Sequence, residues 1–242
     1  ESLQLSREAG FGEGEQSALN QLAAIYGLRG ELDKALACFR QCMEVVAKTG
    51  DSYGRAVGLN NIGWTLKSMG RWAEATEHFH RAIALCEEHN YHDLLLAARM
   101  ELGELSLKRS DYESAALMFD ATVKAEQEAH HSGRLLREAL SNLGWTRFRA
   151  GDLAQAEETL HEAARLGETA EDRYVLATVN RRRAELALAR GRLDAADELL
   201  AQAERHATEL SLQREQGEVL RVKALLSATR GEPGPSRDPS AP

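Results

Sequence analysis

The side chains best suited to acid–base catalysis or metal binding are the histidines and cysteines, of which the chain has eight and three. His78 and His80 stand two residues apart, so on a helix their side chains point about 200° apart and cannot share a metal ion. Two further histidine pairs fall where helices are expected to end: His89 with His92, and His130 with His131. The sequence contains no HExxH, P-loop or G-x-S-x-G motif and no Cys–His constellation. We therefore predict no catalytic residue, no metal site and no cofactor, and a protein that is not an enzyme.

The cysteines Cys38, Cys42 and Cys86 are an odd number without the spacing of metal ligands. Cys38 and Cys42 lie one helical turn apart within a periodic apolar set, which predicts small buried side chains rather than a disulfide framework. Free buried thiols are typical of a reducing compartment, so we expect a cytoplasmic protein. No apolar run approaches the roughly 18 residues that a membrane span needs.

The charge of the chain argues against a nucleic-acid partner. The formal net charge is -8, and the one dense basic run is Arg181-Arg182-Arg183. Successive residues of a helix fan across about 200°, so this run does not form a single basic patch. Arg181 by itself remains a candidate for contact with an acidic partner.

A repeat positions these residues along the chain. Glycine, with serine as the one substitute, recurs every 40 or 41 residues, at Gly30, Gly70, Ser110, Gly151, Gly191 and Gly231. A fixed period between roughly 20 and 50 residues indicates a solenoid of repeated units. Alanine, leucine, glutamate and arginine dominate the sequence, and all four favour helices, so we predict an all-α protein.

Each repeat is predicted to be two antiparallel helices. Leu59, Ile62, Gly63 and Leu66 form one apolar stripe at helical spacing, and Gly70 ends that helix because only glycine adopts the left-handed cap without penalty. First helices are expected near 16–29, 53–69, 93–109, 133–150, 172–190 and 212–230. Second helices are expected near 32–48, 72–89, 112–130, 153–168 and 193–208.

The start of each second helix carries its own signals. Trp72 opens one of them where leucine or tyrosine stands in the other repeats, so we predict a buried tryptophan there. Ser110 with Glu113 three residues on has the spacing of a capping box, and Asp152 with Gln155 offers a similar cap.

The repeats resemble the tetratricopeptide repeat, whose pattern is W-x2-L-G-x2-Y followed by A-x3-F. The residues that carry the resemblance are Leu19, Leu22, Ala23, Tyr26, Ala35 and Phe39; Leu59, Ile62, Gly63, Leu66, Ala75 and Phe79; Arg99, Leu102, Gly103, Ser106, Ala115 and Phe119; Leu140, Leu143, Gly144, Arg147, Ala156 and Leu160; and Asn180, Arg183, Ala184, Ala187, Ala196 and Leu200. The small residues let the two helices of a pair approach closely, and a larger side chain there is expected to force them apart.

Two features depart from the family pattern. The period is 40 rather than about 34 residues, and the proline expected at the end of each repeat is missing. Such long repeats are similar to those of bacterial signalling and regulatory proteins. The resemblance implies a right-handed α-solenoid of antiparallel helix pairs.

The domain organisation follows from the repeat register. Residues 1–15 are expected to end a preceding repeat, and 16–230 to form the array of five helix pairs plus one unpaired final helix. Residues 231–242 hold all four prolines of the chain, which predicts a disordered tail or linker. The chain begins with Glu1, and we interpret it as a fragment of a longer protein.

The resemblance also implies a concave groove, lined by one flank of each first helix, that holds a peptide. Asn60, Trp64 and Lys67 lie about 80–140° from the centre of the packing stripe, on that flank. The candidate groove residues are Asn20, Asn60, Trp64, Lys67, Met100, Glu104, Lys108, Ser141, Trp145, Arg149, Arg181 and Glu185.

Trp64 and Trp145 are the most informative of these candidates, because the packing stripe requires no aromatic residue at their position. An exposed tryptophan is a natural anchor for a partner; the alternative is that each packs on the helix of the neighbouring repeat. Asn20 and Asn60 could bind the backbone of an extended peptide, since an amide offers both a donor and an acceptor. Their alternative roles are to bridge adjacent repeats or to contact water.

Taken together, the sequence predicts a protein–protein interaction module that binds a peptide or helix of a partner within a larger signalling or transcription-regulatory protein. Two alternatives remain open. One is a sensor of a signal peptide or small ligand that gates a transcription factor. The other is a scaffold that forms homo-oligomers through its open terminal helices. We expect neither a membrane nor a nucleic acid as partner.

Overall fold

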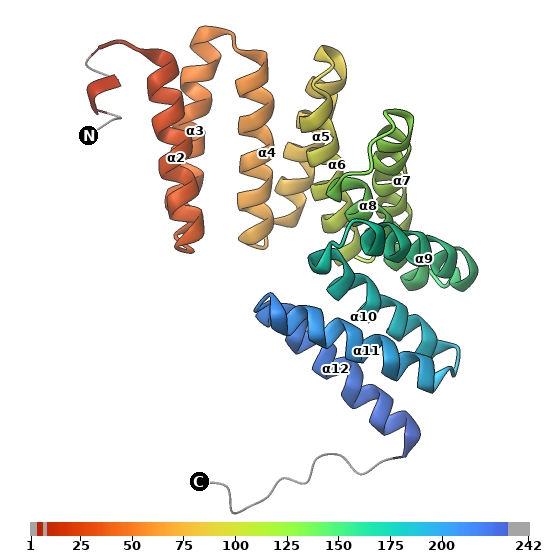
Figure 1. The fold of residues 1–242 in the computed structure, drawn as a ribbon. Helices are drawn as coiled ribbons and strands as arrows, with labels where there is room; N and C mark the ends of the chain where they lie inside the picture. Colours follow the sequence, from red (N-terminus) through yellow and green to blue (C-terminus); the bar gives the residue numbers. More distant parts are fainter. Residues whose placement is uncertain (1–3, 7–8, 232–242) are drawn as a thin grey trace, which may run out of the picture. The chain divides into compact units, whose positions relative to one another are not determined.

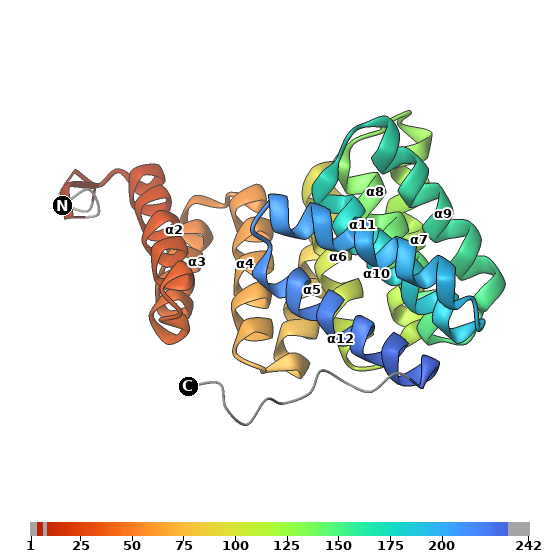
Figure 2. The same ribbon diagram turned by 60° about the horizontal axis from the view of Figure 1, so that its bottom comes forward.

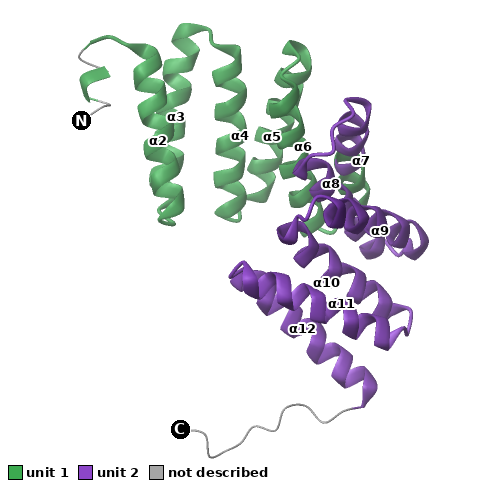
Figure 3. Cartoon of the chain, in the orientation of Figure 1, with its two compact units in different colours: residues 1–118 green, residues 119–242 purple. Residues whose placement is uncertain are grey.

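A computed structural model describes residues 4–6 and 9–231, which form helices joined by short turns (Figure 1). The chain divides into two compact units, residues 1–118 and 119–242 (Figure 3). Unit 1 contains α2 (Gly12–Leu28), α3 (Leu32–Thr49), α4 (Ser52–Ser68), α5 (Trp72–His89) and α6 (His92–Lys108). Helix α7 (Tyr112–Glu128) contains the boundary. Unit 2 contains α8 (Arg134–Arg149), α9 (Leu153–Thr169), α10 (Arg173–Ala189), α11 (Leu193–Glu209) and α12 (Gln213–Arg230).

Unit 1 is built from helix pairs that pack side by side. Helix α2 packs against α3 and α4 against α5, and the pairs are joined by contacts of α3 with α4 and of α5 with α6. Helices α4 and α6, each the first helix of its pair, also touch. The core between these helices is apolar and includes Phe39 and Phe79, of which Phe79 is fully buried.

Unit 2 repeats the same scheme. Helix α8 pairs with α9 and α10 with α11, while α9 packs on α10 and α11 on α12 (Figure 2). The first helices α8, α10 and α12 form a second row of contacts. Within each unit, the predicted all-α solenoid of antiparallel helix pairs is confirmed.

The predicted close approach within pairs is confirmed at two glycines. A Cβ atom added to Gly63 would lie 2.7 Å from a ring carbon of Phe79. One added to Gly144 would lie 2.7 Å from Leu160 Cγ and 3.1 Å from the Leu160 backbone nitrogen. At these two positions the second helix leaves no room for a methyl group, although two other repeats hold alanine at the equivalent position.

The turns follow the predicted glycine spacing, with one difference at Ser110. Gly70 and its equivalents have positive φ, and Ser110 adopts the same left-handed conformation with φ 60°. The predicted capping box at Ser110 is wrong, because Asp111 caps this helix by accepting a hydrogen bond from the Ser114 amide at 3.1 Å. The predicted cap at Asp152 is confirmed, since its carboxylate accepts from the Gln155 amide.

Three further sequence predictions can be checked against the fold. The cysteines are free and buried, as expected. Trp72 is 41% exposed, so its predicted place in the core is wrong; as the first residue of α5 it stands at the end of a helix, where cover is incomplete. Helix α2 begins at Gly12 rather than near 16, and the Phe11 ring lies so close to Gly14 that an added Cβ atom would overlap it.

The two ends of the chain are described only in part. The expected end of a preceding repeat, 1–15, includes residues outside the described ranges, and the expected tail lies outside them beyond Gly231. Among the described residues, the helices lack the length and apolar character that crossing a membrane requires.

Candidate functional site

The predicted groove residues belong to the first helices of the pairs and form two patches, one in each unit. The unit 1 patch consists of Asn20 on α2, Asn60, Trp64 and Lys67 on α4, and Met100, Glu104 and Lys108 on α6. The unit 2 patch consists of Ser141, Trp145 and Arg149 on α8, and Arg181 and Glu185 on α10. Direct contacts between α4 and α6, and between α8 and α10, bring members of each patch together.

Trp64 is the large apolar side chain of the unit 1 patch. It is 40% exposed, and its ring also lies over Gly27 of α2, where an added Cβ atom would stand 3.5 Å from the nearest ring carbon. The tryptophan therefore packs on the neighbouring pair and still presents part of its ring to solvent. The packing on a neighbouring repeat is thus observed, whereas the role of an anchor for a partner stays a prediction.

Asn20 and Asn60 occupy the same position in successive repeats and share an unusual environment. Both side chains are half-buried, and both Oδ1 atoms are buried without a hydrogen-bond partner. A buried acceptor left unpaired costs about 1–3 kcal/mol. The Asn20 amide lies beside the Cys42 thiol, whose pKa burial and the Asp51 carboxylate raise to about 11, so this thiol is neutral.

Lys67, a predicted groove residue, is not a free cation. Its side chain is only 8% exposed and forms ion pairs with Glu101 and, at 3.1 Å, with Glu104. Burial alone would lower the pKa of Lys67, but the two glutamates outweigh burial and hold the pKa above its ordinary value. Lys67 thus ties α4 to α6. Elsewhere on α6, Met100 is buried and Lys108 is exposed.

Trp145 is the centre of the unit 2 patch. It is half-buried and packs against Phe148, with the ring centroids 5.1 Å apart. The guanidinium carbons of Arg149, Arg181 and Arg182 lie 5.9, 5.9 and 5.8 Å from its ring centroid. A cation within about 6 Å of an indole face is attracted by the ring. The patch is therefore both aromatic and rich in arginine.

Hydrogen bonds hold Arg181 and Arg182. Arg182, which was not among the candidate groove residues, donates to Ser141 Oγ at 2.7 Å and to Asn142 Oδ1 at 2.8 Å. The Ser141 side chain is buried and positions the arginine rather than facing the groove.

Arg181 is 7% exposed and already has acidic partners within the chain. It donates to Glu185 at 2.7 Å and to Glu215 on α12, and Arg221 of α12 donates to Glu185 at 3.0 Å. This network could not be predicted from the sequence, because Glu215 lies 34 residues away and only the packing of α12 on α10 brings it close.

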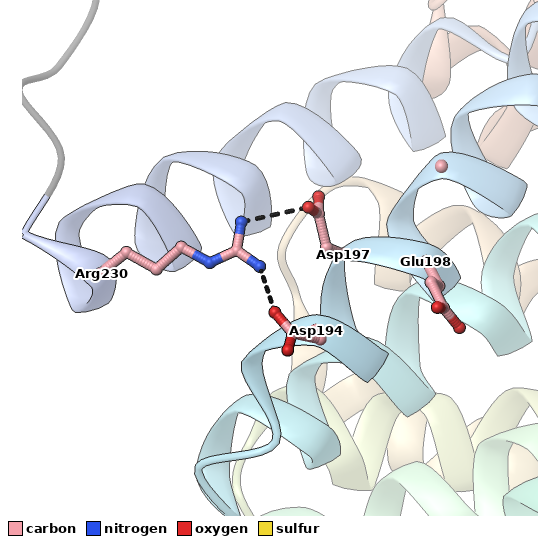
Figure 4. Close-up of a pocket in the computed structure, with 5 residues that line it drawn as sticks. Asp194, Asp197, Glu198 and Arg230 are labelled. Carbon is pink, nitrogen blue, oxygen red and sulfur yellow. Dashed lines mark hydrogen bonds and ion pairs between the residues drawn. The ribbon is translucent and has the colours of Figure 1, made fainter.

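A hollow elsewhere in unit 2 shares no residue with the unit 2 patch. Asp194, Asp197, Glu198, Ala201 and Arg230 line it, and Arg230 donates to Asp194 at 3.0 Å and to Asp197 at 3.1 Å (Figure 4). These ion pairs fasten the end of α12 to α11.

Within the described ranges, no three histidine, cysteine or acidic side chains converge to hold a metal ion. Burial lowers the pKa values of His78 and His206, which favours the neutral imidazole at both positions.

Comparison with known proteins adds two family matches and a partial relative. Two models, both described as tetratricopeptide repeat, match residues 15–88 and 137–162. Response regulator aspartate phosphatase J of Bacillus subtilis (strain 168) is 28% identical over 96 residues, which are 40% of this chain and 26% of the relative. The chain thus matches about a quarter of the length of that relative.

Several solved structures share the fold. Aspartyl phosphate phosphatase F from Bacillus subtilis superposes with a TM-score of 0.78 at 15% identity, covering 95% of this chain and 60% of that one. TPR-like repeats of a Podosopora anserina kinesin light chain give 0.68 at 19% identity, covering 80% and 95%. A Rap protein complexed with Competence and Sporulation Factor gives 0.63 at 16% identity, covering 89% and 65%.

Proposed function

Because the chain is a tetratricopeptide repeat protein, a protein–protein interaction module, we propose that its first-helix patches bind a segment of a protein partner. Repeat arrays present extended surfaces made of equivalent positions in successive repeats, which suits them to gripping a peptide or helix. The unit 1 patch and the unit 2 patch each supply such positions.

The observation that carries this proposal is the environment of Trp64. A tryptophan that is 40% exposed on this flank offers a large apolar surface, and its contact with Gly27 holds the ring in place. Rigid, partly exposed aromatic residues make good anchors because little side-chain freedom is lost on binding.

The asparagines add support from a different direction. The Oδ1 atoms of Asn20 and Asn60 are buried and accept no hydrogen bond, so each amide would gain by turning toward a donor. The backbone N–H groups of an extended peptide are such donors. The two asparagines hold the same position in successive repeats, so one bound segment could meet both.

In a more specific form of this proposal, the bound segment is a signal peptide. One structural neighbour was solved with Competence and Sporulation Factor, and the partial relative is named for a response regulator. A regulatory role in bacterial signalling, with a peptide in the groove, is consistent with both. A sensor that gates a transcription factor remains the alternative form of the same binding function.

Two tryptophans of similar exposure allow a controlled test of the proposed binding surface. Peptides are selected from a random display library on the full chain, and their affinities are measured for the wild type, Trp64→Ala and Trp72→Ala. The two tryptophans are almost equally exposed, at 40% and 41%, but Trp72 lies outside the patch. We expect Trp64→Ala to weaken binding about thirtyfold, the loss typical of a hot spot of about 2 kcal/mol. We expect Trp72→Ala to stay within about twofold of the wild type. Equal losses, or no loss in Trp64→Ala with the helical content intact, would contradict the proposal.

A further inference from the structure

Arg181 stands apart from its equivalents in the other repeats. The same position holds Asn20, Asn60, Met100 and Ser141, none of which carries a charge. In unit 2 the guanidinium lies 5.9 Å from the Trp145 ring centroid and is almost fully buried. A buried charge needs partners, and this one takes carboxylates from two different helices.

The two carboxylates hold Arg181 in different ways. Glu185 lies on the same helix, one turn along, and binds Arg221 through its other oxygen. Glu215 comes from the first turn of α12 and also accepts a hydrogen bond from Thr178 Oγ1 at 3.4 Å. Glu185 is therefore a fixed neighbour, whereas Glu215 reaches the arginine only while the first turn of α12 stays docked.

The rest of α12 is held by apolar contacts that do not involve Arg181. Val219 and Val222 are fully buried and Leu226 is 3% exposed, all within the core shared with α10 and α11. The first turn lies N-terminal to these anchors. Gln216 also holds this turn, because its side chain donates to Ala207 O at 3.1 Å. Loss of the Arg181–Glu215 ion pair would thus loosen the turn while the body of the helix stays in place.

We propose that Glu215 occupies the place of a carboxylate from an acidic segment of the protein partner, which displaces it from Arg181 and releases the first turn of α12. This inference rests on the proposed function and names the chemistry that the unit 2 patch recognises. Charge complementarity supports it: three guanidinium groups surround Trp145, and a guanidinium with its five N–H donors suits carboxylates. The bound state exchanges one carboxylate for another, so the buried arginine keeps its partner throughout.

The test compares two glutamates of the same helix. Glu215→Gln removes the competing carboxylate, and Glu218→Gln makes the same charge change three residues on, where the side chain binds Arg221 instead. Affinity is measured for an end-blocked hexaglutamate peptide and for its hexaglutamine counterpart at about 0.15 M salt. Hydrogen–deuterium exchange of residues 213–218 in the wild type is followed with and without hexaglutamate.

We expect Glu215→Gln to bind hexaglutamate at least fivefold more tightly than the wild type does. The affinity of Glu218→Gln for hexaglutamate should stay within twofold of the wild-type affinity. Neither variant should bind hexaglutamine more tightly than the wild type does. Exchange in 213–218 should become faster when hexaglutamate is bound. Equal affinities of the two variants, no binding by Glu215→Gln at millimolar peptide, or unchanged exchange would overturn the inference. If Glu215→Gln loses helical content, Glu215→Asp, which keeps the charge but shortens its reach, should show a smaller gain, and no gain would also overturn it. The library peptides and Trp64→Ala test the unit 1 patch separately, so either proposal can fail alone.

Discussion

At the scale of single residues, Gly63 shows how closely the two helices of a pair approach. The ring of Phe79 leaves no space for a methyl group at this position, whereas Gly217 in α12 has no atom within 4 Å of the place that a Cβ would take. The same substitution should therefore act in opposite directions at the two glycines.

We predict that Gly63→Ala lowers the free energy of unfolding by about 1–3 kcal/mol, because the added methyl group forces α4 and α5 apart. Gly217→Ala should raise it by up to about 1 kcal/mol, since alanine favours a helix and nothing obstructs it. Denaturant unfolding followed by circular dichroism measures both. A gain at Gly63 equal to that at Gly217 would show that helix propensity, not packing, sets the effect.

The roles of some residues in packing and in the candidate site could be predicted from the sequence, and those of others could not. Gly63 could be found because its small size recurs with the period at the helix contact. The exposure of Trp72 could not be predicted. Periodicity places a side chain on one face of a helix but does not show whether the end of that face is covered by other residues. The partner of Arg181 was equally hidden, since Glu215 comes from another repeat.

At the scale of elements, Asp172 fastens the start of α10 to α8. Its carboxylate caps α10 by accepting from the Val175 amide, and it pairs with Arg134 and, at 2.8 Å, with the buried Arg137. Burial alone would raise the pKa of Asp172, but these hydrogen bonds outweigh burial and lower the pKa below its ordinary value. The carboxylate therefore stabilises the fold in its charged form.

We predict that Asp172→Asn lowers the free energy of unfolding at pH 7 by about 3 kcal/mol, because Arg137 is left buried without its counter-ion. Asparagine still caps a helix, so the loss reports on the ion pair rather than the cap. A carboxyl with a lowered folded-state pKa stabilises above its unfolded value, about 3.9, and loses this effect as the pH falls through its folded value. The difference between wild type and variant should shrink below about pH 4. Unfolding measured from pH 7 to pH 2.5 checks both parts.

An exposed acid in the same unit provides the control for this prediction. Glu209 pairs with Arg173 at 3.3 Å, and both side chains are largely open to solvent. Glu209→Gln should change stability by less than about 1 kcal/mol, as exposed ion pairs do. A similar loss in the two variants, or a gap that does not depend on pH, would contradict the role given to Asp172.

The sequence predicts the elements better than their caps. Helix positions follow from the apolar spacing and the recurring glycines, and the described helices lie within a few residues of the expected ranges. Ser110 was misinterpreted because a serine fits both a helix cap and, less often, a left-handed turn. Its φ of 60° could not be deduced from residue type.

At the scale of the whole molecule, each unit repeats one scheme of contacts but presents a different chemistry on its first helices. The unit 1 patch combines a partly exposed tryptophan with two unpaired amide oxygens, whereas the unit 2 patch gathers guanidinium groups around Trp145. The period predicts the shared scheme. It does not predict the division between the units, which falls inside α7 without a break in the repeat.

Photo-crosslinking tests whether a partner binds along the first helices. Benzoylphenylalanine replaces either Ala24 of α2, which holds the position of Trp64 in the preceding repeat, or Ala37 of α3, on a second helix; both alanines are exposed. The full chain is irradiated with a library-selected peptide at saturating concentration. If the partner lies along the first helices, we expect a cross-linked product from position 24 and little or none from position 37. Equal cross-linking at both positions, or cross-linking from position 37 alone, would contradict it.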